Sequence, residues 1–362
     1  MKTYMFPGQG AQAKGMGGTL FDEFQDLTRK ADAILGYSIK ELCLEDPRTE
    51  LNRTQFTQPA LYVVNALSYY KKLSDTAKPE FLAGHSLGEF NALLAAECFD
   101  FETGLTLVQK RGELMGQVSG GGMAAILNAS KEEIEGILSR NGLTQVDLAN
   151  YNTPSQIVIS GLADEVAKAQ PLFQTGMMLY YPLNTSGAFH SRFMHAVKEQ
   201  FREFLATCKF ADLKIPVISN VTARPYENAA ILENLANQMV SGVRWSESIQ
   251  YLMALGTERG DTMQFEEVGY GDVLTRLAQT IRRQTPVKKP EMSVAPSKPG
   301  AAPEKVSAWN KKHPIGTRVK SLIADYANLE TRTEAVVLFG HRAAVYMKGY
   351  NGYFDLDEIA PA

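Results

Sequence analysis

A serine between two glycines is the first candidate for chemistry in this chain. Ser86 stands in the sequence Gly84-His85-Ser86-Leu87-Gly88, which fits the pattern G-x-S-x-G. This pattern is typical of a nucleophilic serine on a sharp turn between a strand and a helix, although a serine in an ordinary loop matches it by chance. A serine hydroxyl attacks a carbonyl carbon only when a nearby base accepts its proton. The pattern therefore predicts acyl chemistry at Ser86 if a base and the right secondary structure accompany it.

Histidine is the usual base near neutral pH, and the chain has five of them. His85 is adjacent to Ser86, but adjacent side chains on a tight turn diverge. His190 follows the small residues of Ser186-Gly187-Ala188-Phe189, which would allow a close approach to another segment. A lone histidine more often has a structural role, but the serine motif reverses that balance for His190. The two histidines beyond residue 300 are interpreted as surface or turn residues.

The segments around Ser86 have the order that a nucleophilic serine requires. Residues 81–83 form a short apolar run that predicts a strand, and residues 89–96 are rich in small helix formers. Residues 3–6 predict a second buried strand, which runs directly into the turn Pro7-Gly8-Gln9-Gly10. The chain therefore predicts an α/β body with Ser86 between a strand and a helix.

The pattern changes between about residues 122 and 187. Strands are predicted at 123–127, 146–149, 156–160 and 177–183, with one helix that opens at 130–133 and another at 164–175. The order β-α-β-β-α-β is that of a ferredoxin-like subdomain. We expect this subdomain to be inserted into the larger body of residues 1–284.

The last part of the chain has a different composition. Residues 285–304 are rich in Pro, Lys, Ala and Ser and are interpreted as a linker. Residues 305–362 contain short strand patterns separated by glycine turns, which predict a small all-β, SH3-like barrel. The role of this barrel is left open.

Composition excludes several other classes of protein. The 362 residues are 44% hydrophobic, and the formal net charge of −3 gives no basic surface for nucleic acid. The three cysteines are far apart without the spacing of metal ligands, which fits a reducing compartment. No apolar run is long enough for a signal peptide or a membrane span. We therefore expect a soluble cytoplasmic protein with no metal site and no membrane partner.

Further motifs resemble those of one enzyme family in their order along the chain. They are Gly8-Gln9-Gly10-Ala11-Gln12, Gly84-His85-Ser86-Leu87-Gly88-Glu89, Gln109-Lys110-Arg111-Gly112, Ala188-Phe189-His190-Ser191, Ile218-Ser219-Asn220-Val221, Val243-Arg244-Trp245 and Glu267-Val268-Gly269. Over roughly residues 1–285 the chain resembles malonyl-CoA:acyl carrier protein transacylases, and it looks most like the discrete acyltransferases of trans-acyltransferase polyketide synthases. The resemblance implies an α/β-hydrolase-like core with a parallel sheet.

The resemblance also implies roles for the residues of the first motifs. Ser86 would be the acylated nucleophile and His190 its base, with the main-chain carbonyl of Gln238 orienting the imidazole. The main-chain N–H groups of Gln9 and Leu87 would form the oxyanion hole, since a developing oxyanion needs fixed donors.

Four other positions would shape the acyl pocket. Arg111 would bind the free carboxylate of a malonyl group, although an arginine on a helix is usually a solvated charge. Phe189 would fill the space that an α-methyl group needs, and its alternative is ordinary core packing. Gln58 and Asn152 match pocket positions, where capping or turn roles are the alternatives.

The implied reaction is transfer of malonyl from malonyl-CoA to the phosphopantetheine thiol of an acyl carrier protein on another polypeptide. It would follow a ping-pong mechanism through a malonyl-serine ester, without metal or resident cofactor. Polyketide biosynthesis is the expected pathway, and fatty acid synthesis is the alternative.

Two rival functions are alternatives to this one. An editing hydrolase of the same fold would remove acyl groups from carrier proteins, but the related hydrolases lack arginine at the position of Arg111. A non-catalytic docking adaptor would use the barrel, and the set of Ser86, His190 and Arg111 argues against it for the main body.

Overall fold

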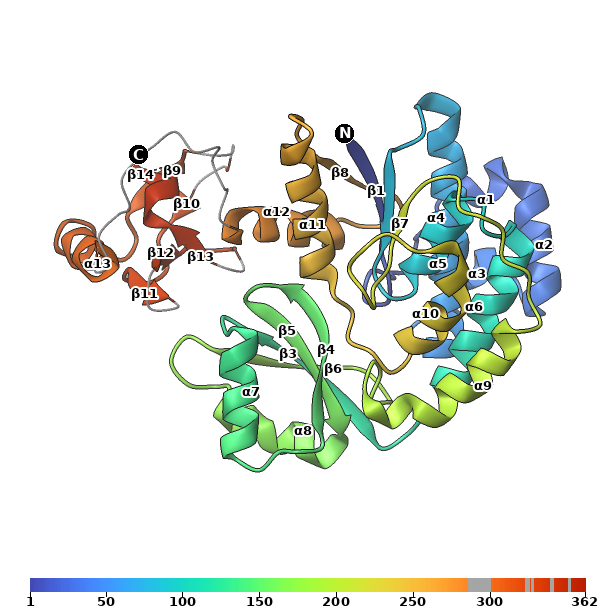
Figure 1. Cartoon of the computed structure of the whole chain (residues 1–362), viewed down its shortest axis with the longest axis horizontal. Coiled ribbons are helices and arrows are strands. Elements are labelled where there is room, and N and C mark those ends of the chain that lie inside the picture. The colour runs from blue at the N-terminus through green and yellow to red at the C-terminus, as the bar shows by residue number, and fades with distance from the viewer. Residues whose placement is uncertain (286–300, 323–325, 327–328, 339–341, 351–352) are drawn as a thin grey trace. The chain divides into compact units, whose positions relative to one another are not determined.

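The computed structural model describes residues 1–285, 301–322, 326, 329–338, 342–350 and 353–362 (Figure 1). The chain divides into two compact units, Met1–Arg282 and Arg283–Ala362. The first unit contains every predicted site residue, so its strands and helices determine how these residues are positioned.

A four-stranded parallel sheet forms the framework of the first unit. Its strand order is β7-β2-β1-β8, with bounds β1 Lys2–Phe6, β2 Phe81–Gly84, β7 Val217–Ile218 and β8 Gln264–Glu267. Tyr4 and Phe6 of β1 point into one hydrophobic core, and Met5 points into another. Because both faces are covered, the strand reads as a continuous apolar run. The predicted α/β body with a parallel sheet is confirmed.

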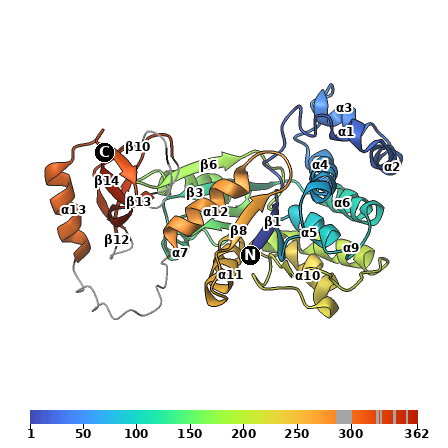
Figure 2. The same ribbon diagram turned by 90° about the horizontal axis from the view of Figure 1, so that it is seen from above.

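Helices cover both faces of this sheet. Figure 2 shows α11 and α12 on one side of β1 and β8, and α4, α5 and α6 on the other. The larger core packs against α1 Leu20–Glu23, α2 Gln25–Leu35, α3 Ile39–Leu44, α4 Thr54–Asp75, α5 Gly88–Ala95, α6 Phe101–Gly116, α9 His195–Leu205 and α10 Ile231–Gln238. The smaller core packs against α11 Trp245–Glu258 and α12 Val273–Gln284. Within the described ranges, no helix is both long and apolar enough to cross a membrane.

A second, antiparallel sheet lies within the same unit. Its strand order is β4-β5-β3-β6, and the elements follow as β3 Gly121–Leu127, α7 Lys131–Arg140, β4 Val146–Thr153, β5 Gln156–Leu162, α8 Ala163–Ala169 and β6 Leu179–Leu183. The helices α7 and α8 share one core with Ala124 and Ile126. The alternate side chains of β3, among them Met123 and Ala125, pack into the larger core instead. This sheet therefore presents one face to the body that carries Ser86.

The second unit contains two three-stranded antiparallel sheets and a helix. The sheets have the orders β10-β9-β14 and β11-β12-β13, with bounds β9 Arg318–Ser321, β10 Leu329–Glu330, β11 Val336–Leu338, β12 Arg342–Tyr346, β13 Tyr353–Asp355 and β14 Ile359–Pro361. The helix α13, Ala301–Lys312, packs Ala302, Val306 and Trp309 into the core of this unit.

The expectation of an all-β C-terminal part is therefore corrected. The end of the predicted linker and the start of the predicted barrel form α13, because Ala, Glu and Lys favour helix and Pro303 lies in the first turn, where no N–H is needed. Residues 286–300 of the predicted linker lie outside the described residues.

Candidate active site

Ser86 occupies a tight turn from β2 into α5. Its backbone has a φ of 51°, in the left-handed region that non-glycine residues adopt at a cost in free energy. The flanking glycines are required by close packing, because a Cβ on Gly84 would lie 2.0 Å from Gly88 C and one on Gly88 would lie 2.0 Å from Phe6 O. The amide of Ser86 donates to Asn220 Oδ1 at 2.7 Å. The elbow predicted from G-x-S-x-G is thus formed and braced.

His190 lies beside Ser86 with its ring correctly oriented for proton transfer. The distance from Ser86 Oγ to His190 Nε2 is 2.8 Å, and His190 Nδ1 lies 2.9 Å from the carbonyl oxygen of Gln238. Since a carbonyl only accepts, Nδ1 carries the proton and Nε2 presents a lone pair to the hydroxyl. The structure therefore brings together the predicted nucleophile, base and orienting carbonyl.

The surroundings of His190 keep its imidazole neutral. Burial and, next, the nearby positive charge of Arg111 together lower its pKa to about 3. The ring is therefore ready to accept a proton at neutral pH, and a developing imidazolium would exist only while the reaction proceeds.

We expect the His190 imidazole to stay neutral from about pH 7.5 to about pH 5, a range in which an ordinary histidine of pKa near 6.5 becomes protonated. The measurement is an NMR titration of protein with isotope-labelled histidine, in which the His190→Gln variant identifies the resonance. A midpoint near pH 6.5 for that resonance would contradict the depressed pKa.

Arg111 points from α6 into the same site. It is 1% exposed; its Nη1 donates to Gln58 Oε1 at 2.7 Å, and its Nη2 donates to Gln238 Oε1 at 2.9 Å and to Ser86 Oγ at 3.1 Å. Burial lowers the pKa of Arg111 to about 10, while the charge of Glu89 raises it, so the guanidinium remains cationic at neutral pH. A buried cation thus lies in hydrogen-bond contact with the nucleophile.

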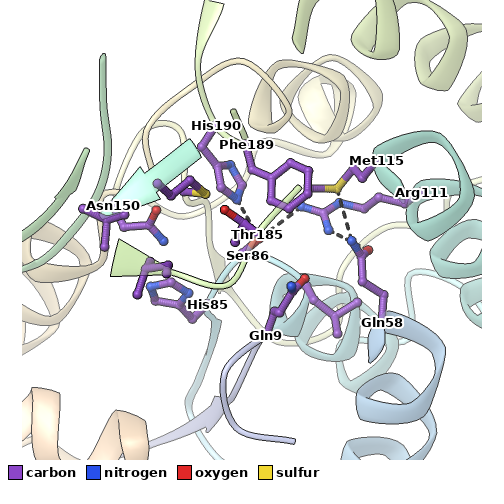
Figure 3. A pocket seen from close by; sticks show the side chains of 14 residues that line it. Gln9, Gln58, His85, Ser86, Arg111, Met115, Asn150, Thr185, Phe189 and His190 are labelled. Atoms are coloured by element: carbon purple, nitrogen blue, oxygen red, sulfur yellow. Dashed lines mark hydrogen bonds between the residues drawn. The ribbon is translucent and has the colours of Figure 1, made fainter. Parts of the chain in front are cut away.

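A pocket of about 100 Å³ opens above these groups, and Figure 3 shows Ser86 at its centre with His190 on one side and Arg111 on another. Its walls combine apolar side chains with a few polar ones, as is usual for small-molecule sites. The lining residues are Gln9, Gln58, His85, Ser86, Leu87, Arg111, Met115, Met123, Asn150, Val158, Leu183, Thr185, Phe189 and His190. The predicted positions Gln9, Gln58, Leu87 and Phe189 are therefore pocket residues.

The turn after β1 packs directly against the elbow. A Cβ on Gly8 would lie 2.3 Å from the carbonyl oxygen of His85, so only glycine lets the turn approach the elbow this closely. Gly10 adopts a φ of 106°, a backbone conformation that favours glycine. Gln9 and Leu87 both line the pocket beside Ser86.

Asn152 departs from its predicted place. It is not among the lining residues, and its Oδ1 lies 2.8 Å from Nε2 of the lining residue His85. Asn150 lines the pocket instead (Figure 3). In an ideal strand the two asparagines would face the same way, but β4 changes register between Leu148 and Asn150 and again between Tyr151 and Thr153. The prediction of Asn152 as a pocket residue is therefore wrong, and its partner His85 is a wall residue that sequence reasoning set aside.

The other missed wall residues come from separate elements. Met115 lies on α6 together with Arg111, Met123 lies on β3, and Thr185 follows β6. No local motif marks them, since only the packing of the antiparallel sheet on the body brings them together. Among the described residues, no group of three or more His, Cys, Asp and Glu side chains could hold a metal ion.

Residues 3–288 match the family model of the acyl transferase domain. This chain belongs to that family. The polyketide biosynthesis malonyl CoA-acyl carrier protein transacylase PksC of Bacillus subtilis (strain 168) is 57% identical over 286 residues, which cover 78% of this chain and 98% of PksC. A solved malonyl CoA-acyl carrier protein transacylase from Burkholderia pseudomallei is 64% identical with a TM-score of 0.79, covering 79% of this chain and 99% of that one.

A third relative was solved with its partner. This malonyl-transacylase in complex with a type II polyketide synthase acyl-carrier protein is 31% identical to the acyl transferase described here, with a TM-score of 0.72 and coverage of 77% of this chain and 92% of that one. In this acyl transferase the family match ends at residue 288, so nearly all of the second unit lies outside it.

Proposed function

We propose that this acyl transferase moves malonyl from malonyl-CoA to the phosphopantetheine thiol of an acyl carrier protein in trans. The observation that carries the proposal is the buried Arg111 guanidinium in hydrogen-bond contact with Ser86 Oγ, inside a pocket that also presents His190. A fixed cation next to the nucleophile suits an acyl group that ends in a carboxylate. The relatives PksC and the transacylase from B. pseudomallei carry the same activity in their names.

The first half-reaction forms the acyl-enzyme. Ser86 Oγ attacks the thioester carbonyl carbon as His190 Nε2 accepts the hydroxyl proton, and the main-chain N–H groups of Gln9 and Leu87 donate to the oxyanion. Collapse of the tetrahedral intermediate breaks the carbon–sulfur bond, and the CoA thiolate takes the proton from His190. The product is a malonyl-serine ester.

The second half-reaction runs the same steps with a different nucleophile. The carrier's phosphopantetheine thiol gives its proton to His190 and attacks the ester, and Ser86 leaves as the hydroxyl. Because CoA departs before the carrier reacts, the kinetics are ping-pong. The nucleophile, base and oxyanion donors all come from the chain, so the scheme needs neither a metal nor a resident cofactor.

Two residues set the choice of acyl group. Arg111 binds the malonyl carboxylate through parallel N–H donors, with Gln58 holding one side of the guanidinium. Phe189 is buried at the pocket wall, where its ring restricts the space beside the α-carbon. One methyl group changes discrimination by about 1–3 kcal/mol, so we expect preference for malonyl over methylmalonyl and not absolute exclusion.

The alternatives fit less well. An editing hydrolase has no use for a buried cation at the nucleophile, and Arg111 supplies one. The names of PksC and of its Bacillus velezensis counterpart BaeC favour polyketide biosynthesis over fatty acid synthesis.

The architecture supports finer assignments that we also propose. The parallel sheet with its serine elbow is α/β-hydrolase-like, and the β-α-β-β-α-β subdomain with strand order β4-β5-β3-β6 is ferredoxin-like. In the second unit, the two small antiparallel sheets joined by the bridge between Thr331 and Met347 support an SH3-like barrel preceded by α13.

A competition experiment tests the function. The protein is incubated with equal concentrations of malonyl-, methylmalonyl- and acetyl-CoA, and its intact mass and the free acids are measured with and without a holo carrier protein. The proposal expects mainly malonyl-enzyme, which persists until the carrier is added. Rapid release of free acid without the carrier would favour the hydrolase.

A chain ending at Thr285 should keep its self-malonylation rate within about twofold of the full chain, because the pocket residues all lie in the first unit. The solved relative from B. pseudomallei covers 79% of this chain over 99% of its own length, and the family match ends at residue 288. Rates of acylation by malonyl-CoA check this, and the KM for the carrier is measured beside them. A raised carrier KM with unchanged self-malonylation would make the second unit a docking module, and loss of self-malonylation would contradict the prediction.

A further inference from the structure

Gln238 contacts the catalytic groups through both its main chain and its side chain. Its main-chain carbonyl orients His190, while its side-chain Oε1 accepts from Arg111 Nη2 at 2.9 Å. Its Nε2 donates to the carbonyl oxygen of Ser86 at 3.0 Å and to Glu89 Oε2. One residue at the end of α10 thus touches the base, the guanidinium and the nucleophile's backbone.

The neighbours leave only one orientation for the Gln238 amide. Arg111 has donors and no acceptor, so the atom that faces it must be the oxygen. Ser86 O and Glu89 Oε2 only accept, so the atom that faces them must be the nitrogen. The carboxylate of Glu89 therefore helps to determine that Gln238 presents an acceptor to Arg111.

Glu89 has no direct place in the reaction, yet it is fully buried in the first turn of α5. Its Oε1 accepts from Asn220 N and from the Tyr226 hydroxyl, both at 2.8 Å, and its Oε2 accepts from Gln238. Burial raises the pKa of Glu89 to about 7, whereas these three hydrogen bonds and the charge of Arg111 favour the carboxylate. Burying a carboxylate costs free energy of folding. One of the groups that donate to Glu89, the side-chain amide of Gln238, also contacts Arg111 in the acyl pocket.

We propose that Glu89 is a positioning residue for acyl selection: through the side-chain amide of Gln238 it holds Arg111 against Ser86 in the orientation that receives a carboxylate. This inference rests on the proposed function, since it gives a second residue responsibility for the selectivity that Arg111 confers. Gln238 accordingly has two separable roles, base orientation through its main chain and arginine orientation through its side chain.

The isosteric change Glu89→Gln separates this role from simple packing. Asn220 N and the Tyr226 hydroxyl both donate to one oxygen, so the new amide keeps its oxygen there and turns its NH₂ toward Gln238. Two NH₂ groups would then face each other. Gln238 relieves this either by moving its side chain away or by rotating its amide, and rotation also sets its oxygen against Ser86 O. Both changes take the Gln238 acceptor from Arg111 Nη2, so the guanidinium is no longer held in its place.

The experiment compares kcat/KM for self-acylation by malonyl-CoA and by acetyl-CoA at about pH 8, where Glu89 is ionised. The variants are Glu89→Gln, Gln238→Met, the double variant and Arg111→Ala. Glu267→Gln is the matched control, since Glu267 is a partly buried carboxylate that accepts from Leu274 N and Thr275 N. Thermal unfolding of each variant establishes that it is folded.

We expect Glu89→Gln and Gln238→Met each to lower the malonyl-to-acetyl ratio of kcat/KM by about tenfold to a hundredfold, because the malonyl rate falls more than the acetyl rate. Because both act through one contact to Arg111, the double variant should show the malonyl-to-acetyl ratio of Gln238→Met alone. The Glu267→Gln control should keep the wild-type ratio.

The inference is overturned if Glu89→Gln keeps the wild-type malonyl-to-acetyl ratio, which includes an equal fall of the malonyl and acetyl rates. The proposed function still stands in that case if Arg111→Ala loses the preference for malonyl. A wild-type enzyme without malonyl preference overturns both. If Glu89→Gln does not fold, Gln238→Met decides alone, since its main-chain carbonyl to His190 is unchanged: loss of the ratio supports the inference and a wild-type ratio overturns it.

Discussion

Replacing Ser86 by alanine should abolish covalent malonylation of the protein and lower malonyl transfer to a carrier by roughly 10⁴-fold or more. The reason is the loss of the hydroxyl oxygen that lies 2.8 Å from His190 Nε2. Incubation with malonyl-CoA followed by proteolysis and mass spectrometry should find one malonyl group on the wild-type peptide that contains Ser86, and none on the variant.

The control for this experiment is Ser68→Ala, which removes a part-buried hydroxyl of α4 that donates to Val64 O and does not line the pocket. It should be labelled like the wild type. Persistent labelling of Ser86→Ala at any residue would show that another group is the nucleophile.

Replacing Arg111 by alanine should lower kcat/KM for malonyl-CoA by roughly 10²-fold, since a charge-assisted contact to the substrate carboxylate is lost. The rate with acetyl-CoA should be kept or rise, because that acyl group has no carboxylate to bind. Parallel self-acylation rates with the two thioesters measure both effects.

The alanine variant also leaves Glu89 buried without its neighbouring cation, which is costly to stability. Arg111→Lys is therefore made beside it: lysine keeps the charge but loses the planar fork, so it should fold and still favour malonyl less than wild type does. Equal loss on malonyl-CoA and acetyl-CoA in a folded variant would make Arg111 a structural residue and not a selectivity device.

The parts of the site that sequence predicts are those with local causes. A serine between glycines forces a strand–turn–helix elbow, and the structure shows why, since a Cβ on Gly84 or Gly88 would overlap backbone. The continuous apolar run at the N-terminus indicates a strand covered on both faces, and β1 is such a strand. The small residues before His190 favoured it as the base. The roles of Arg111 and Gln238 followed only from resemblance, because nothing near them in sequence reports their distance from Ser86.

The parts that sequence missed have causes in tertiary packing. Because the register of β4 shifts, Asn150 and not Asn152 lines the pocket, and no residue pattern predicts such a bulge. Glu89 looks like an ordinary acid in the first turn of a helix, and only its contact with Gln238 shows otherwise. The helix α13 was not predicted, because it begins in a segment whose Pro, Ala and Lys content is typical of a linker.

In the proposed mechanism, Ser86 carries malonyl from CoA to a carrier protein. The most direct test isolates the malonyl-enzyme free of CoA and mixes it with a holo acyl carrier protein, following both intact masses in time. We expect one malonyl mass to leave the enzyme and appear on the carrier's phosphopantetheine arm, with none appearing when the enzyme is Ser86→Ala. Loss of the malonyl group to water while the carrier mass stays unchanged would contradict the account.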